Sequence, residues 1–188
     1  MSRIIAGQAA GRRLVPVKGD QTRPTTDRVK EALFSRLESW EALSEARVAD
    51  LFAGSGALGL EAASRGAANV VFVDKSPVAY AALTANVKAL DSVLGADLRT
   101  YRQSAETFAV SMPAQSFDLI FIDPPYDMAD RKVNELLEVA APLLAPDGVI
   151  VIERGKRADA PTWPDCINAL KPRTYGETTL YFADRPLT

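Results

Sequence analysis

The stretch "RVADLFAGSGALGLEAASRG", residues 47–66, passes from an apolar strand through a glycine turn into a helix. Gly54, Gly56 and Gly59 form the pattern G-x-G-x-x-G directly after the strand, where glycines let the backbone pass close beneath a ligand. Asp74 follows twenty residues after Gly54, at the end of the next apolar run, where a carboxylate can accept hydrogen bonds from ribose hydroxyls. This arrangement predicts a nucleotide-binding α/β fold.

Strands and helices alternate along most of the remaining chain. The further expected strands are at 69–76, 97–105, 117–123 and 149–154. The expected helices are at 57–66, 77–90 and 131–148. Segment 167–184 reads instead as two strands around Tyr175 and Gly176, which predicts a terminal antiparallel hairpin. The alternation is typical of a doubly wound parallel sheet, and we expect a crevice above its first and fourth strands.

Composition limits the chemistry that this 188-residue chain can perform. It contains no histidine and one cysteine, which excludes a histidine general base, a serine–histidine triad and a histidine-ligated metal. We therefore expect no metal site. No apolar run reaches about eighteen residues and no leader is recognisable, so we expect no membrane span. The single cysteine fits the reducing cytoplasm.

The charge of the chain is uneven. Its formal net charge is −2, yet the first 30 residues contain seven Arg or Lys side chains and two Asp side chains. Short apolar stretches around Gly7 and Gly11 predict a small hairpin, and the segment after Thr26 or Asp27 predicts an amphipathic helix. The basic segment favours a nucleic-acid partner, with a solvated basic arm as the alternative.

Asp50, at the start of the glycine turn, bears on the choice of ligand. A dinucleotide would place its pyrophosphate at the start of the following helix, where a nearby carboxylate would repel it. S-adenosylmethionine carries no phosphate, and its amino-acid end would occupy the turn with its ammonium group within reach of Asp50. These residues therefore favour S-adenosylmethionine over NAD.

A second signal follows the fourth expected strand, in "FDLIFIDPPYDMAD", residues 117–130. Pro124 and Pro125 donate no N–H group, so carbonyl oxygens near them are free to accept hydrogen bonds. Asp123 adds an acceptor, and Tyr126 adds a flat ring. The set fits a planar base with an exocyclic amine, which Asp123 and a proline carbonyl would hold while Tyr126 stacks on the base. The alternative is a proline-rich loop capped by a core tyrosine.

This motif resembles the [Asn/Asp]-Pro-Pro-[Tyr/Phe] motif of S-adenosylmethionine-dependent methyltransferases that act on amino groups of nucleic-acid bases. The segments "RIIAG", "TRPTTDRVKEALF", "DLFAGSGALGLEAASRGA" and "YGETTLYF" are similar to a bacterial family that methylates a guanine exocyclic amine in small-subunit (16S) ribosomal RNA. The resemblance extends over roughly residues 3–182.

The resemblance implies a seven-stranded Rossmann-like methyltransferase fold for residues 41–188, with residues 1–40 as a basic extension packed on it. The guanine would be held by Asp123, Pro124, Pro125 and Tyr126. The implied S-adenosylmethionine-binding residues are Asp50, Phe52, Gly54, Gly56, Asp74, Lys75, Ser104 and Glu106. The implied contacts to the RNA backbone are Arg12, Arg13, Arg23, Arg28 and Lys30.

Some assignments stay open on sequence alone. Relatives commonly place an acid after the third strand to hold the adenine amine, and here either Ser104 or Glu106 can fill that role. Lys75 can lie near the adenine or be an exposed surface lysine. The expected partner is small-subunit ribosomal RNA within an assembled or assembling subunit, and the expected enzyme is a cytoplasmic monomer.

Three other functions fit parts of the sequence. A DNA adenine methyltransferase shares the proline motif, but the chain has no room for a separate target-recognition domain. An NAD-dependent oxidoreductase fits the glycine turn, but Asp50 and the lack of histidine argue against it. A non-catalytic RNA-binding assembly factor fits the basic segment, but the intact motif at 123–126 argues against it.

Overall fold

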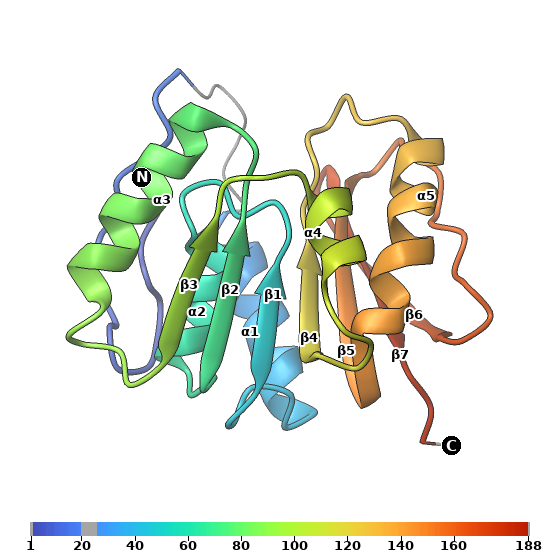
Figure 1. Ribbon diagram of the computed structural model, residues 1–188, viewed down its shortest axis with the longest axis horizontal. Helices are drawn as coiled ribbons and strands as arrows, with labels where there is room; N and C mark the ends of the chain where they lie inside the picture. The colour runs from blue at the N-terminus through green and yellow to red at the C-terminus, as the bar shows by residue number, and fades with distance from the viewer. Residues whose placement is uncertain (1, 20–25, 188) are drawn as a thin grey trace.

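The computed structural model describes residues 2–19 and 26–187. They form a seven-stranded sheet in the order β3-β2-β1-β4-β5-β7-β6 (Figure 1). The strands are β1 (Arg47–Asp50), β2 (Asn69–Val73), β3 (Asp97–Tyr101), β4 (Phe117–Ile122), β5 (Leu144–Gly155), β6 (Asn168–Tyr175) and β7 (Thr178–Asp184). Strands β1 to β5 are parallel, whereas β7 is antiparallel to β5 and β6. The predicted doubly wound sheet and terminal hairpin are confirmed.

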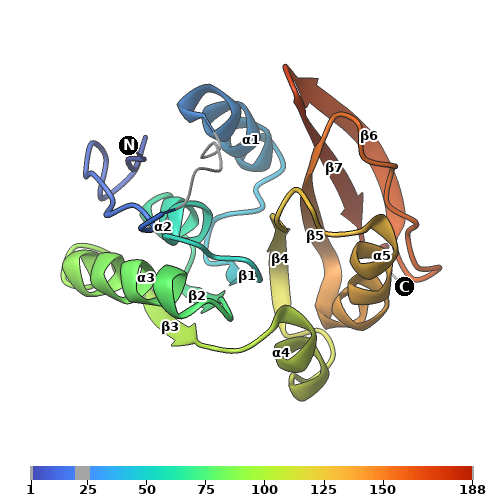
Figure 2. The ribbon, with the colours of Figure 1, turned by 90° about the horizontal axis from the view of Figure 1, so that it is seen from above.

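Helices cover both faces of this sheet. They are α1 (Asp27–Ser39), α2 (Ala57–Ser64), α3 (Pro77–Leu90), α4 (Ala105–Ser111) and α5 (Asp130–Ala140), followed by the short 3₁₀ helix η1 (Ala141–Leu143). Helices α1, α2 and α3 lie on one face, and α4 and α5 lie on the other (Figure 2). Each face has its own apolar core, built around Phe34, Leu60 and Leu83 on the first and Phe108 and Leu136 on the second.

Three helices begin at hydroxyl side chains that cap them, as the sequence predicts for the first. Thr26 accepts a hydrogen bond from the Val29 N–H at 3.3 Å. Ser76 does the same for α3, where Pro77 fills the first turn and needs no N–H partner. Ser104 caps α4. None of the helices in the described ranges is both long and apolar enough to cross a membrane.

Two expectations about local structure were wrong. The helix expected at 131–148 ends at Ala140, and strand β5 already begins at Leu144. Pro142 explains the early end, because its ring and missing N–H group oppose a continued α-helix. Helix α4 was not expected at all, because its seven residues contain too short an apolar pattern to be recognised.

The N-terminal segment, residues 2–19, is anchored to helix α2 by buried polar groups. Glu61 accepts hydrogen bonds from the N–H groups of Ile5 at 2.8 Å and Ala6 at 3.1 Å. Gly7 has φ +84°, and a Cβ atom there would lie 1.8 Å from the Ser64 carbonyl oxygen, so the close approach requires glycine. The small hairpin expected here is present: residues 3 and 13 form an antiparallel bridge, and the Ile4 N–H donates to the Arg12 carbonyl and the Gly11 N–H to the Ile4 carbonyl, each at 2.8 Å.

Candidate functional site

The three glycines of the turn after β1 have different structural roles. Gly54 has φ +55°, and nothing lies within 4 Å of the position that a Cβ atom would occupy, so the turn is open at this point. Gly56, with φ +89°, is the left-handed residue that begins α2. A Cβ atom on Gly59 would lie 2.4 Å from the Phe72 ring, so this glycine lets α2 pack closely on β2. Only Gly54 is therefore left to accommodate a ligand.

Asp50 is a buried carboxylate beneath this turn. Its side chain is 1% exposed, and Oδ2 accepts a hydrogen bond from the Gly59 N–H at 3.0 Å. Among the described residues, Oδ1 has no hydrogen-bond partner although it is buried. Burial raises the pKa of Asp50 to about 7, since an ionised carboxylate loses its hydration there, and nearby Asp74 acts in the same direction. An unpaired buried oxygen fits a cationic ligand that would complete its hydrogen bonds.

Asp74 braces the glycine turn from the end of β2. Its two oxygens accept hydrogen bonds from the N–H groups of Gly54 and Ser76, each at 2.9 Å. A carboxylate can accept about four hydrogen bonds, so half-buried Asp74 retains capacity for the two ribose hydroxyls expected from the sequence. The residue therefore shapes the turn and remains a candidate ligand contact.

Strand register brings the glycine turn and the proline motif together. Asp50 is paired with Phe121 across β1 and β4, and the Leu51 N–H donates to the Phe121 carbonyl at 3.1 Å. Because the two strands are parallel neighbours, the segments that follow them leave the sheet at the same edge. This carboxyl edge is at the top of Figure 1. The order also reverses between β1 and β4, where ligand crevices form in such sheets.

The proline motif passes from the core to the surface within four residues. Asp123 is half-buried, Pro124 is buried and Pro125 is exposed. Tyr126 is 56% exposed, so it is not the core tyrosine that the alternative reading required. The Pro125 carbonyl accepts a hydrogen bond from the Met128 N–H at 3.0 Å. Within the described ranges, the Pro124 carbonyl has no such partner, which leaves it as an acceptor for a ligand.

The residues expected around the adenine lie on neighbouring segments of the same edge. The Ser104 hydroxyl accepts a hydrogen bond from the Thr107 N–H at 3.1 Å, so it is already engaged in capping α4. Glu106 is exposed in the first turn of that helix. Lys75 is exposed, and Phe52 is half-buried against the core beneath α4 and α5. This arrangement favours Glu106 over Ser104 as the residue that accepts a hydrogen bond from the adenine amine.

The expected RNA contacts divide into three groups. Arg12, Arg13 and Arg28 are exposed and remain available to a partner. Arg23 lies outside the described residues. The expectation for Lys30 was wrong, since its side chain is 1% exposed and lies 3.5 Å from Glu61. Desolvation lowers the pKa of Lys30, partly offset by Glu61.

Two site-forming residues received no role from the sequence. Asn86, buried in α3, accepts a hydrogen bond from the Val15 N–H at 2.7 Å and donates to the Val15 carbonyl at 2.9 Å and the Ser55 carbonyl at 2.8 Å. It thereby ties the N-terminal segment to the glycine turn. Arg154, at the end of β5, donates to the Met128 carbonyl at 2.9 Å and thus holds the loop beyond the proline motif. The sequence did contain a signal for Asn86, because it is an asparagine within an otherwise apolar helix pattern.

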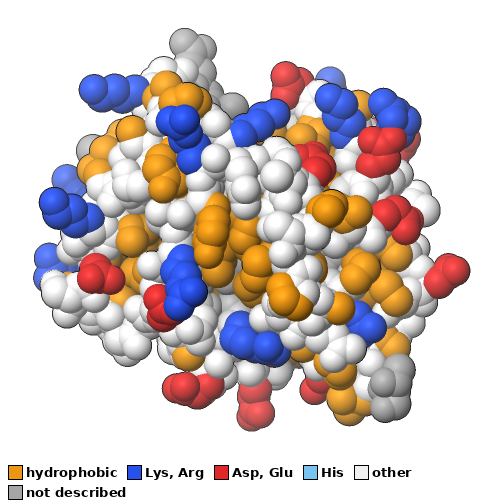
Figure 3. Space-filling model, in the orientation of Figure 1, with side chains coloured by type: hydrophobic (Ala, Val, Ile, Leu, Met, Phe, Trp, Pro, Cys, Tyr) orange, Lys and Arg blue, Asp and Glu red, His pale blue; other side chains and the backbone are white. Residues whose placement is uncertain are grey.

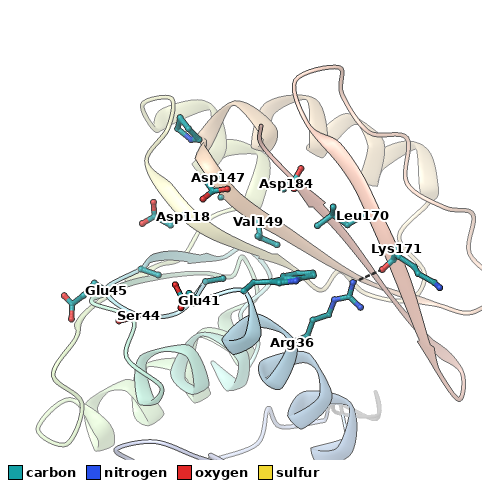
Figure 4. Close-up of a pocket in the computed structure, with 15 residues that line it drawn as sticks. Arg36, Glu41, Ser44, Glu45, Asp118, Asp147, Val149, Leu170, Lys171 and Asp184 are labelled. Atoms are coloured by element: carbon teal, nitrogen blue, oxygen red, sulfur yellow. Dashed lines mark hydrogen bonds between the residues drawn. The ribbon is translucent and has the colours of Figure 1, made fainter. Parts of the chain in front are cut away.

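A cavity of about 690 Å³ lies at the opposite, amino-terminal edge of the sheet (Figure 4). Arg36 lies 4.5 Å from the centre of the Trp40 ring and donates to the Lys171 carbonyl at 3.3 Å. Asp118 is paired with Arg47 at 2.8 Å. These groups bind one another, and the cavity contains neither the glycine turn nor the proline motif. We therefore place the functional site at the carboxyl edge.

Known proteins match the chain over nearly its whole length. YlbH of Bacillus subtilis strain 168 is 37% identical over 180 residues, covering 94% of this chain and 95% of YlbH. Ribosomal RNA small subunit methyltransferase D of Haemophilus influenzae is 34% identical over 177 residues, covering 93% and 89% of the two chains. The structure of yhhF from Escherichia coli superposes with a TM-score of 0.84 at 30% identity and covers 98% of each chain.

The sheet order, the open glycine turn and its buried acid define an S-adenosylmethionine-dependent methyltransferase. The sequence profile of the family described as conserved hypothetical protein 95 matches residues 2–184. The chain belongs to this family.

Proposed function

We propose that this protein transfers a methyl group from S-adenosylmethionine to the exocyclic amine of a guanine in small-subunit ribosomal RNA. The observation that carries the proposal is the register of Asp50 with Phe121, which sets the glycine turn beside Asp123. The name of the relative from Haemophilus influenzae supports ribosomal RNA as the substrate class. The proline motif supports an amine as the acceptor.

The chain supplies a separate group for each end of the cofactor. Bound S-adenosylmethionine would supply a methyl group on its sulfonium: the amine nitrogen would take the methyl group by in-line displacement, the carbon–sulfur bond would break so that the thioether leaves, and the amine would lose one proton to solvent. We assign Asp50 to the methionine ammonium because its Oδ1 is buried and unpaired in the described part of the chain. Asp74 would accept hydrogen bonds from the ribose hydroxyls, Glu106 would accept one from the adenine amine, and the open turn at Gly54 leaves room for the methionine backbone.

The proline motif orients the guanine. Asp123 and the Pro124 carbonyl accept hydrogen bonds from the two amine hydrogens, which turns the nitrogen lone pair toward the methyl group. The Pro125 carbonyl is unsuitable, because it already accepts from Met128. The exposed ring of Tyr126 stacks on the base, which must leave its helix to reach the loop.

Residues 1–40 act as an extension on a methyltransferase core of residues 41–188. Arg12, Arg13 and Arg28 contact the RNA backbone, which fixes the register of the RNA without selecting the base. The substrate is an assembled or assembling small subunit in the cytoplasm, and the enzyme works as a monomer. In the described part of the extension the exposed basic side chains are Arg3, Arg12, Arg13, Lys18 and Arg28. This is a modest basic surface, and ribosomal proteins would add to the affinity.

The proposal is tested by offering labelled S-adenosylmethionine with three substrates: unmodified small subunits, free 16S RNA and DNA. We expect label in the ribosomal RNA, most rapidly when it is part of a particle, and no label in DNA. Label that appears in DNA alone would replace the proposed function with DNA methylation. Boiled enzyme serves as the control for adventitious incorporation.

Binding of S-adenosylmethionine should depend on pH through Asp50. The free carboxyl has a pKa near 7, and a bound ammonium group would favour its ionised form and lower that pKa. Binding should therefore release a proton below pH 7, and the affinity should fall by up to about tenfold per unit as pH decreases from 7. Above about pH 8 Asp50 is fully ionised and adds no further gain, and the affinity should fall where the ligand's own ammonium group loses its proton.

Calorimetric titration in two buffers of different ionisation enthalpy measures both the affinity and the proton release. Asp50→Asn is the matched variant, because it preserves shape but cannot titrate. We expect weaker binding without the pH dependence. Equal affinity of the wild type at pH 5.5 and pH 8 would contradict the assignment of Asp50 to the ammonium group.

A further inference from the structure

A groove of about 480 Å³ lies beside the proline motif, between the loop that follows β4 and the loop that follows β5. Tyr126 lines one wall, and Lys156 and Arg157 line the other. Its volume is in the range of pockets that hold small ligands. Because Tyr126 belongs to both the motif and the groove, a strand whose target base reaches Asp123 would continue along this groove.

An ion pair between buried Arg154 and the partly exposed Asp130 joins the two walls. The Arg154 side chain is 4% exposed and lies 2.7 Å from Asp130 Oδ1, at the start of α5. The same guanidinium donates to the Met128 carbonyl at 2.9 Å. The charge of Asp130 is therefore satisfied within the protein, and the groove is held in shape before any ligand arrives. A preformed site loses less conformational entropy on binding than a mobile one.

The loop after β5 is fixed by its backbone. The Lys156 N–H donates to the Glu177 carbonyl at 2.7 Å, and the Ala158 N–H donates to the Gly155 carbonyl at 3.0 Å. Gly155 lies directly against the tyrosine, since a Cβ atom there would be 3.3 Å from Cδ1 of Tyr126. The loop that carries Lys156 and Arg157 therefore packs against the Tyr126 ring at Gly155.

The basic wall has charge available for a ligand. Lys156 and Arg157 are both exposed, and neither forms an ion pair within residues 2–19 and 26–187. The groove lining also contains two acidic residues. Asp130 is paired with Arg154, whereas Glu177 is exposed and is not paired with Arg154. Figure 3 shows Lys and Arg side chains along the upper edge of the molecule, where the parallel strands end. An anion is the ligand that these two side chains fit.

We propose that this groove is a second nucleotide subsite, which takes the sugar–phosphate of the nucleotide next to the target guanine. Lys156 and Arg157 contact its phosphate, while Tyr126 separates it from the base held at Asp123. This inference rests on the proposed function, and it adds a contact surface on the core to the N-terminal basic extension.

The test compares Lys156→Ala/Arg157→Ala with the control pair Lys171→Ala/Arg173→Ala, whose exposed basic side chains lie on β6 outside the groove. Initial rates are measured against the concentration of small subunits at several salt concentrations. The first pair should raise KM several-fold and reduce the salt slope of binding by about one, because the two side chains contact a single phosphate. Its kcat and its affinity for S-adenosylmethionine should stay unchanged, and the control pair should behave like the wild type.

The outcomes separate the subsite from the proposed function. An unchanged salt slope in the first pair, or an equal loss in both pairs, would overturn the subsite while the wild type still methylates RNA. A wild type that methylates no RNA would overturn the proposed function, and the subsite with it. Thermal melting of both pairs checks that these exposed substitutions leave the fold intact.

Discussion

Replacement of Asp123 by alanine is expected to slow methyl transfer by at least about a hundredfold while S-adenosylmethionine still binds. The side chain lies just beyond β4, at the edge where the glycine turn also opens. Without its carboxylate the guanine amine loses one of two acceptors, and its lone pair no longer points toward the methyl group. Single-turnover rates with small subunits and calorimetric titration of the cofactor measure the two effects separately.

Asp123→Asn is the matched control. It keeps an acceptor oxygen at the same place, and asparagine occupies this position in some proteins that carry the motif. We therefore expect the asparagine variant to retain measurable activity and the alanine variant to lose nearly all of it. Near-normal turnover by Asp123→Ala would show that the carboxylate does not orient the amine.

Replacement of Glu61 by alanine is expected to destabilise the fold by about 3–5 kcal/mol, because it leaves buried charges without their partner. Glu61 lies 3.5 Å from Lys30 Nζ and 2.8 Å from Arg65 Nε, and all three side chains are at most 5% exposed. The same carboxylate binds the N–H groups of Ile5 and Ala6. Its loss should release the N-terminal segment and lower the melting temperature by roughly 10 °C.

Glu38→Ala provides the comparison for this network. Glu38 binds the same Arg65 at 3.0 Å, but its side chain is 51% exposed, so its removal should cost less than about 1 kcal/mol. Chemical denaturation of both variants gives the two free energies of unfolding. Similar small losses in both variants would show that the buried network does not anchor the segment.

The features that the sequence predicted correctly are local. The glycine turn, the apolar strand before Asp123 and the hydroxyl cap at Thr26 each depend on residues within a few positions of one another. Alternation of strands and helices then restricted the topology to a parallel sheet, which placed the two motifs at one edge. The parallel sheet and the crevice above its first and fourth strands were therefore predicted from the alternation of strands and helices, whereas the complete strand order comes from the structure.

The features that it missed depend on partners distant in sequence. Lys30 looked like an RNA contact because nothing near it in sequence shows that Glu61 will enclose it. The roles of Asn86 and Arg154 likewise arise only when α3 meets residue 15 and β5 meets the loop after β4. The end of α5 was a different kind of error, since Pro142 was visible in the sequence and its effect on the helix was overlooked.

The identity of the methylated nucleoside tests the central claim most directly. Unmodified small subunits would be incubated with labelled S-adenosylmethionine and the enzyme, and their RNA digested to nucleosides and resolved by mass spectrometry. An amine held by Asp123 and Pro124 beside the glycine turn predicts that the label is found in N2-methylguanosine. Label in a methylated adenosine or on a ribose oxygen, with none on guanosine, would contradict this account.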